Sequence, residues 1–241
     1  MRSKLKFLLA LAPGASTQAL DAGLRAAETR ILSAQPGIGV LRATRVDDAT
    51  LQKIGAGAFD AAEPLDAQFE IISTHADPAA LVPLADALRE SLAGLVDPAR
   101  SVALAGQELQ VSTGDGLLLV TIANRRLPQF DHAGFIDYWR NNHSEFAQGN
   151  VPPEVGLGYR QFHTDEAATQ DLLAITGFAI GDFDGAAECH YRDADGVKML
   201  MGMEDVVARA TEDERRFVDH ARCATSVMMI AGDSSGHQLG G

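Results

Sequence analysis

Several residue types are scarce in this sequence, and each shortage narrows the range of functions. The 241 residues include only two cysteines, and the basic residues number 20 against 33 acidic ones. Because Cys189 and Cys223 follow no repeated spacing, a disulfide scaffold is excluded and reduced thiols are expected. The net charge of -13 disfavours nucleic acid and anionic membranes as partners, since binding to either depends on clustered basic side chains.

The sequence also lacks any apolar run near the roughly 20 residues that span a bilayer. Its first residues do have the basic head and apolar continuation of a secretory signal. However, the apolar run stops at Pro13-Gly14, and charged and apolar residues alternate from Lys4 to Phe7 as on a half-buried strand. We therefore expect an N-terminal strand and a cytoplasmic protein.

The first half of the chain predicts the element order βαββαβ. Apolar runs and alternating patterns predict strands over residues 5–11, 38–46, 69–73 and 102–111. Helical spacing and capping residues predict one helix that is capped by Ser16 or Thr17 and runs to about Ala34, and a second that starts at Asp77. A Gly/Ala-rich loop is expected around residues 55–62. This order is the ferredoxin-like plan, in which an antiparallel sheet takes both helices on one face.

The second half repeats this plan. Strands are predicted over residues 117–123, 158–164, 186–191 and 224–230. Helices are predicted over about 133–146, with Asp131 as the cap, and over about 197–219. The segment from Gly37 to Thr44 aligns with Gly156 to His163, with two glycines at the same spacing. We expect an α+β protein with one ferredoxin-like repeat in residues 1–114, a second in 115–231, and a flexible tail over 232–241.

Each predicted sheet has one face without helices, and the sister repeat can cover it. We therefore expect the repeats to pack sheet to sheet as an internal pseudo-dimeric α/β barrel, with a chamber for one apolar ligand between them. The copies differ in their polar residues, because Val40 and Thr44 occupy the places of Tyr159 and His163. Chemistry is thus predicted in the second repeat alone.

Five residues of the second repeat form the predicted site. Trp139 and His143 are four apart on a helix and share a face. The helix dipole favours the charged form of a histidine near the C-terminal end, which suits a general acid. Tyr159, Gln161 and His163 alternate along a strand and point to one side. We predict that His143, His163 and Tyr159 are catalytic and transfer protons in the chamber, while Trp139 and Gln161 contact the substrate.

These residues belong to a set of short motifs. They comprise Arg126-Leu-Pro-Gln-Phe130, Phe135-Ile-Asp-Tyr-Trp-Arg-Asn-Asn-His143, Gly158 to His163, Phe183-Asp-Gly-Ala-Ala-Glu188 and Asp213-Glu-Arg-Arg-Phe217. Over about residues 117–230, the chain resembles the EthD-like family of the dimeric α/β-barrel superfamily. The resemblance implies a ferredoxin-like barrel that acts without a cofactor on hydrophobic, frequently aromatic compounds. Family members are usually one repeat long and pair between chains, so a homodimer is also considered, although this chain has two repeats.

Four other residues are candidate ligand contacts. Tyr138, Glu188, His190 and Arg125 are predicted to contact the substrate, although Arg125 and its neighbour at a strand end are more often a solvated pair. Glu188 and His190 share a strand face, but two-residue spacing is common by chance, so no metal site is predicted. The G-x-S-x-G pattern at residues 232–236 lacks the following helix that a serine hydrolase needs.

The leading functional prediction is a cofactor-independent lyase, dehydratase, isomerase or cyclase. It would use histidine acid-base chemistry on a hydrophobic, aromatic small molecule in catabolism. Two alternatives stay open. One is a cofactorless monooxygenase or a haem-contacting member of the same fold, and the other is a binder of an apolar compound that leaves it unchanged.

Overall fold

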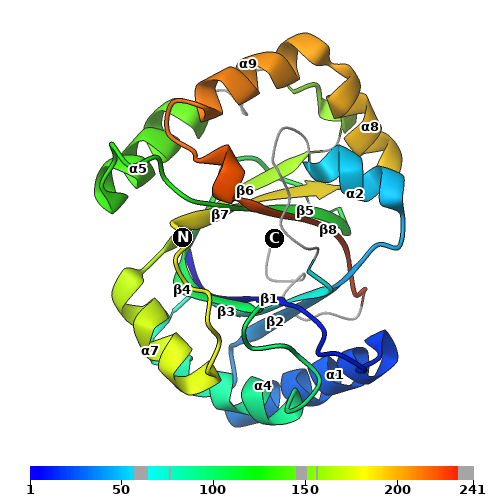
Figure 1. The fold of residues 1–241 in the computed structure, drawn as a ribbon, viewed down its shortest axis with the longest axis vertical. Helices are drawn as coiled ribbons and strands as arrows, with labels where there is room; N and C mark the ends of the chain where they lie inside the picture. Colours follow the sequence, from blue (N-terminus) through cyan, green and yellow to red (C-terminus); the bar gives the residue numbers. More distant parts are fainter. Residues whose placement is uncertain (57–64, 76, 115, 145–150, 156, 233–241) are drawn as a thin grey trace.

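The protein is a closed eight-stranded barrel made of two similar four-stranded sheets (Figure 1). The computed structural model describes residues 1–56, 65–75, 77–114, 116–144, 151–155 and 157–232. The first repeat contributes β1 (Arg2–Leu9), β2 (Gly39–Arg45), β3 (Ala67–Ser73) and β4 (Val102–Gln110). The second contributes β5 (Leu118–Asn124), β6 (Gly158–Thr164), β7 (Gly185–Tyr191) and β8 (Ala224–Ile230). The circular order β1-β3-β2-β8-β5-β7-β6-β4 repeats the ferredoxin-like arrangement in each half.

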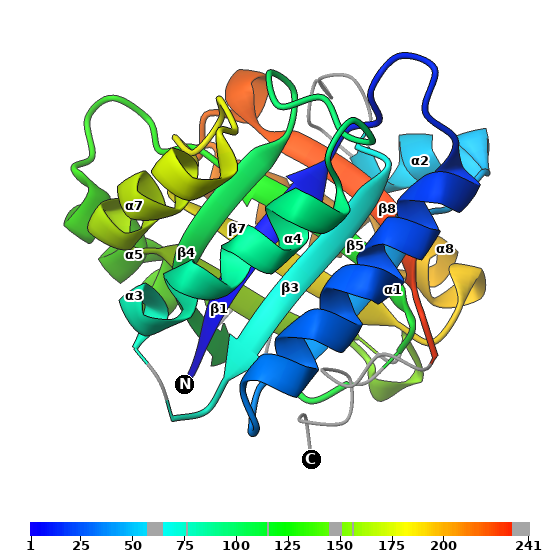
Figure 2. The same cartoon turned by 90° about the horizontal axis from the view of Figure 1, so that it is seen from below.

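Helices cover the outer faces of both sheets. On the first sheet lie α1 (Thr17–Ala34) and the broken helix α3 (Pro78–Leu81), η1 (Val82–Leu84) and α4 (Ala85–Ser91); Figure 2 shows α1 and α4 across the strands. On the second lie α5 (His132–Tyr138) with η2 (Trp139–His143), α8 (Ala194–Gly202) and α9 (Glu204–Glu214). Short 3-10 turns are η3 (Pro153–Val155) and η4 (His220–Arg222).

Each repeat also has one helix that packs against the other repeat. Helix α2 (Ala49–Ala56) follows β2, yet Leu51 packs among residues of the second repeat such as Val227. In return, α7 (Glu166–Thr176) follows β6, and its Leu172 packs in the core beneath α1 and α4. Figure 1 shows α2 beside α8 and α7 beside α4. The two halves are therefore interlocked in three dimensions.

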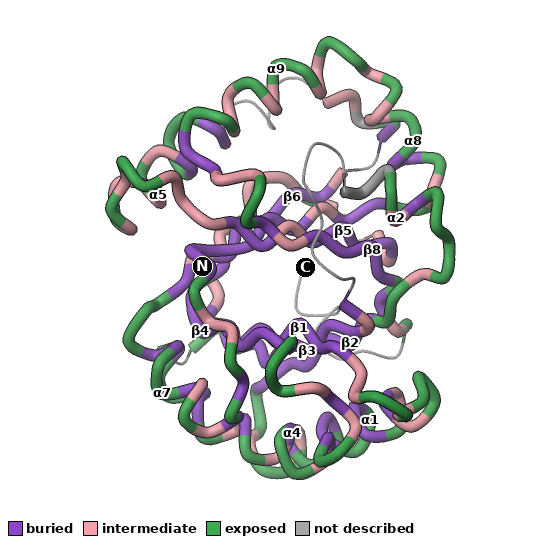
Figure 3. The backbone as a smooth tube through the Cα atoms, in the orientation of Figure 1, coloured by how far each residue is buried: buried purple, intermediate pink, exposed green. Residues whose placement is uncertain are grey.

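The alternation of side chains along β1 separates two environments. Leu5, Phe7 and Leu9 pack under the helices of the first repeat, whereas Leu8 packs with strand residues of the second repeat inside the barrel. Lys4 and Lys6 share the inward direction of Leu8 and are fully buried. The strands are buried almost throughout (Figure 3), so most of their described inward-facing side chains are shielded from solvent.

The α+β class and the internal pseudo-dimeric barrel are confirmed. The predicted caps are also present, because Ser16, Asp77 and Asp131 each accept a hydrogen bond from a backbone N–H in the first turn. The basic and apolar N-terminus forms β1, as predicted.

Three helix predictions need correction. Helices α2 and α7 were missed, because their short apolar stripes cover the sister repeat instead of their own sheet. The helix predicted over 197–219 is two helices that meet near Met203.

Some predictions lie outside the described residues. They are most of the loop at 55–62, the end of the helix at 133–146, and nearly all of the tail and the serine pattern. No helix among the described residues is long and apolar enough to cross a membrane.

Candidate functional site

The predicted site residues of β6 lie between the second sheet and its helices, not between the two sheets. Tyr159 packs with Trp139, Phe135 and Phe217 on the helix-covered face. Phe162, the alternate residue, packs inside the barrel. Tyr159, Gln161 and His163 therefore share a face, as predicted, but it is the outer one. Alternation fixes which residues point together, whereas the cover on each face depends on the assembled fold.

His143 is held at the end of a π-turn. The backbone N–H of Ser144 donates to the carbonyl of Trp139, five residues back, and this wider turn is frequent at functional sites. The turn faces β6, where Gln161 Nε2 donates to the same carbonyl at 3.2 Å and to Ser144 Oγ at 2.9 Å. Strand β6 thus fixes the turn that carries His143.

An aspartate orients the imidazole of His143. Nδ1 lies 2.9 Å from Asp213 Oδ2, and Asp213 Oδ1 accepts from the Tyr138 hydroxyl at 2.8 Å. Since a carboxylate only accepts, Nδ1 carries the proton and Nε2 is left with a lone pair. Burial lowers the pKa of His143, and the bond to Asp213 opposes this only in part. The ring is therefore a neutral base at neutral pH, which differs from the charged form that the helix dipole suggested.

Glu214 faces the other nitrogen of His143. Its Oε1 lies 3.9 Å from Nε2 of His143, and its Oε2 lies 3.5 Å from Nε2 of His220. Burial, and secondarily the charge of Asp213, raises the pKa of Glu214 to about 7. A neutral imidazole and a carboxyl group that carries a proton near neutral pH thus stand side by side, which is the arrangement of a base and an acid.

The phenol of Tyr159 joins these groups. Its oxygen accepts from Trp139 Nε1 at 3.0 Å and lies 3.4 Å from Gln161 Nε2. Burial raises the pKa of Tyr159 well above its ordinary value of 10, so the hydroxyl keeps its proton. With a donor already at the oxygen, that proton is available to a ligand.

His163 lies behind Trp139, at 5.4 Å between ring centroids. Its Nε2 lies 3.0 Å from Gln161 Oε1, and burial lowers its pKa to about 4. A neutral ring donates at Nε2, so His163 fixes the orientation of the Gln161 amide. The structure thus connects His163 to the site through Gln161.

A small cavity joins His143, Glu214 and Tyr159, with Asn124, Trp139 and Phe217 among its other walls. Its volume of about 10 Å³ is close to the space that one water molecule occupies. Helix α9, which ends at Glu214, has no fully buried residue. Few buried contacts give a segment low local stability, so this side of the cavity is the one held least firmly.

The remaining predicted contacts lie elsewhere. Glu188 and His190 point into the barrel, where Glu188 binds Lys4 and Lys6. Their strand face is therefore the opposite of that of His163. Arg125 stacks on Phe183 at 3.8 Å and pairs with Asp182, so it stabilises a loop and does not reach the cavity.

Asp213 and Glu214 were missed as site residues. In the sequence, Asp213-Glu214-Arg215-Arg216 is typical of an exposed helical face. The motif Asp213 to Phe217 was part of the family resemblance, and that was the one signal that could have identified them.

A second polar cluster surrounds Asp184. His132 Nδ1 lies 2.9 Å from Asp184 Oδ1, His132 Nε2 lies 2.9 Å from the Thr164 carbonyl, and Arg126 also pairs with Asp184. His132, Asp184 and Glu166 are close enough to hold a metal ion. However, the guanidinium of Arg126 already neutralises Asp184, and both nitrogens of His132 are engaged. The cluster is a structural ion pair that ties α5 to β6 and β7.

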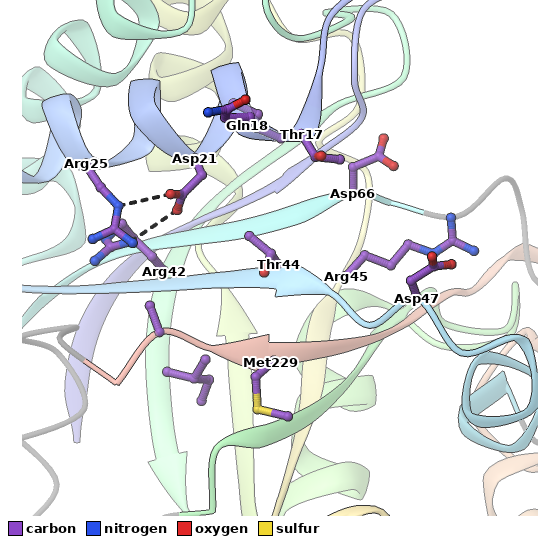
Figure 4. A pocket seen from close by; sticks show the side chains of 13 residues that line it. Thr17, Gln18, Asp21, Arg25, Arg42, Thr44, Arg45, Asp47, Asp66 and Met229 are labelled. Atoms are coloured by element: carbon purple, nitrogen blue, oxygen red, sulfur yellow. Dashed lines mark hydrogen bonds and ion pairs between the residues drawn. The ribbon is translucent and has the colours of Figure 1, made fainter.

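A larger groove of about 750 Å³ lies where β2 meets β8 (Figure 4). Asp21 bridges Arg25 at 2.9 Å and Arg42 at 3.5 Å. Arg42 also pairs with Glu28 at 2.5 Å. These charges balance, and none of the predicted site residues lines the groove, so it provides no ligand assignment.

Comparisons with known proteins agree with this architecture. The family model of the EthD domain matches residues 127–221, a range that includes Trp139, His143, Tyr159 and Glu214. No curated protein matches the chain.

Solved structures share the fold across nearly the whole chain. A provisionally assigned chlorite dismutase has a TM-score of 0.58 at 13% identity, covering 99% of this chain and 98% of its own. An anthrone oxidase-like protein has a TM-score of 0.52 at 12% identity, with coverage of 98% and 93%. A haem-binding protein from Thermus thermophilus has a TM-score of 0.52 at 10% identity, with coverage of 99% and 94%. At such identities the likeness concerns the fold alone. Residues 127–221, within the second repeat, thus match the EthD domain, and the chain as a whole folds as an internally paired α/β barrel.

Proposed function

We propose that the second repeat is an enzyme that moves protons on a small molecule, with His143 as base and Glu214 as acid. The observation that carries this proposal is the oriented pair, in which Asp213 binds Nδ1 of His143 while Nε2 faces Glu214 at 3.9 Å. Orientation by a carboxylate fixes the tautomer that can accept a proton at Nε2. Among the described residues that line the cavity, no other pair combines a free base with a protonated acid.

The reaction class follows from these roles. His143 Nε2 takes a proton from an acidic C–H or O–H of the substrate. Glu214 returns a proton to a neighbouring atom or to a leaving hydroxyl, which gives an isomerisation or an elimination. Tyr159 donates a hydrogen bond to an oxygen on which negative charge develops. The chain therefore fits a lyase or isomerase whose own side chains supply the acid and the base.

The cavity walls favour an aromatic substrate. Trp139, Phe217 and Tyr159 line it, and flat rings stack well on such surfaces. A structural relative is described as anthrone oxidase-like, which names an aromatic compound. Because about 10 Å³ admits no ring, substrate binding must part α9 from η2, and closure then excludes water.

A haem-contacting function is less well supported. A histidine that binds a metal commonly hydrogen-bonds a carboxylate through its other nitrogen, as His143 does with Asp213. Yet Glu214 stands 3.9 Å from the available Nε2, on the side of the imidazole where an iron would bind. The residues do not fit haem in this arrangement.

Deuterium incorporation tests the proposal without knowledge of the final product. Phenolic ketones incubated with the protein in D2O would be analysed by mass spectrometry. We expect exchange of an acidic C–H, reduced about 100-fold or more in His143→Gln and strongly reduced in Glu214→Gln. His75→Gln is the control, since His75 is exposed. Equal exchange in all four proteins would refute the roles, while retention of a phenol without exchange would favour a binder.

A further inference from the structure

The inside of the barrel contains more buried positive charge than negative charge. Among the described residues, the inward-facing cations are Arg2, Lys4, Lys6 and Arg160, and the inward-facing carboxylates are Glu70, Glu108 and Glu188. Lys4, Lys6, Glu70 and Glu188 are 0% exposed. A charge that is taken out of water needs an oppositely charged partner. Each of these cations is therefore expected to pair with a carboxylate.

The three carboxylates are already shared by three of the cations. Glu70 and Glu188 both bind Lys4 and Lys6, with Lys4 Nζ at 2.7 Å from Glu70 and 3.0 Å from Glu188. Glu108 binds Arg2 and Lys4. These contacts account for every inward-facing acid in the part of the chain that the structure describes, and Arg160 takes part in none of them.

Arg160 stands on β6, opposite Glu188 on β7 and opposite Gln110 on β4. It is 5% exposed, and its Nε has no hydrogen-bond acceptor among the described residues. No ion pair joins its guanidinium to any described acid. Gln110 at the same level is exposed, so Arg160 lies just inside one mouth of the barrel.

A second unpartnered group lies beside it. His190 is 0% exposed, and its Nε2 has no partner among the described residues, while its Nδ1 lies 3.4 Å from the Gly116 carbonyl. His190 is two residues beyond Glu188 on the same face of β7, which makes it a diagonal neighbour of Arg160. The positive charge of Arg160 also lowers the pKa of His190, after the larger effect of burial.

We propose that Arg160 binds a small carboxylate at this mouth of the barrel, with His190 Nε2 as a second contact. A guanidinium presents Nε–H and Nη–H as a planar fork that matches a carboxylate. In the Nε2–H tautomer, which gives up the 3.4 Å contact of Nδ1 with the Gly116 carbonyl, His190 donates to the same anion. One bound monoanion supplies the negative charge that Arg160 lacks among the described residues. The ligand is small, because Arg160, His190 and Glu188 are almost completely buried.

Thermal unfolding with sodium formate tests this site, with sodium chloride at equal ionic strength as reference. A formate concentration about ten times its dissociation constant should raise the Tm of the wild-type protein by about 3–6 °C beyond chloride. Arg160→Met should lose this rise. Without formate, it should unfold at or above the wild-type Tm, since an unpaired charge has been removed from the interior. Arg89→Met, at an exposed arginine of α4, should respond like the wild type.

The opposite results would overturn the site. They are a rise equal in chloride and formate, a rise that survives in Arg160→Met, or a large loss of Tm in that variant without formate. If Arg160→Met does not fold, the wild-type protein decides the matter by NMR. The NMR signal of labelled formate should broaden, and the signals of the His190 ring should shift. Unchanged spectra would refute binding.

Discussion

Replacing Glu188 by glutamine removes one negative charge from the contact between the two repeats. The Glu188 carboxylate is fully buried and accepts from Lys6 Nζ at 2.5 Å, from Lys4 Nζ at 3.0 Å and from Gln68 Nε2 at 3.1 Å. All three donors belong to the first repeat, whereas Glu188 belongs to the second. The Glu188→Gln variant would leave Glu70 and Glu108 to balance the buried lysines.

The expected loss of stability in Glu188→Gln follows from the burial of its ion pairs with Lys4 and Lys6. Breaking a buried ion pair by neutralising one partner costs about 3–5 kcal/mol, because the other charge stays out of water. A domain is commonly stable by about 5–15 kcal/mol, so the loss should be a large fraction of the total. Urea unfolding at pH 7 measures it. The fluorescence of Trp139, the single tryptophan, follows the second repeat, and circular dichroism follows the whole chain.

Two further variants make the result specific. Glu90 pairs with Arg30 on the surface, and its side chain is 49% exposed. Glu90→Gln should therefore change the free energy of unfolding by less than about 1 kcal/mol. The double variant Lys6→Met with Glu188→Leu should recover most of the loss, since apolar pairs often replace buried ion pairs without cost. A change below about 1 kcal/mol in Glu188→Gln would refute the reasoning.

Two other predictions concern the second repeat. The bond to Asp184 raises the pKa of His132 above 6.5, so the folded state gains from its protonation at low pH. Urea unfolding should therefore give a stability gap between wild type and His132→Gln that is full below about pH 6.5 and shrinks as the pH rises through the raised pKa; a gap independent of pH would contradict this. A Cβ on Gly106 would lie 2.0 Å from the His163 carbonyl oxygen, so Gly106→Ala should cost about 3 kcal/mol in the same assay. Gly202→Ala, with nothing within 4 Å, should be nearly neutral, and equal stability of both alanine variants would contradict the close approach of β4 and β6.

Much of the fold follows from local signals in the sequence. The duplicated glycines at Gly37 and Gly156 marked the repeat, and capping residues such as Ser16 and Asp131 marked helix starts. Each of these signals depends on only a few neighbouring residues, so it can be recognised in the sequence alone. The interlocking helices α2 and α7 were missed because their apolar sides meet partners in the other repeat, far away along the chain.

The site was predictable only in part. Alternation correctly grouped Tyr159 with Gln161 and His163, but it could not assign the group to the inner or the outer face. Lys4, Lys6 and their acids occupy the inner face together with apolar residues such as Phe162, and this packing exists only in the assembled barrel. The partners of His143 were unpredictable because Asp213 is 70 residues away and the fold of α9 over η2 brings it close.

Helices α2 and α7 each pack on the opposite repeat, and this packing affects whether the two repeats can be produced as separate polypeptides. Each half contains a helix that covers apolar residues of the other, so either half made alone would leave apolar surface in water and should be insoluble. Produced together as separate polypeptides, the halves should reassemble, because the seams of β2 with β8 and of β4 with β6 need no covalent link between them. The architecture thus lends itself to a split reporter, in which recovery of signal reports the meeting of two fused partners.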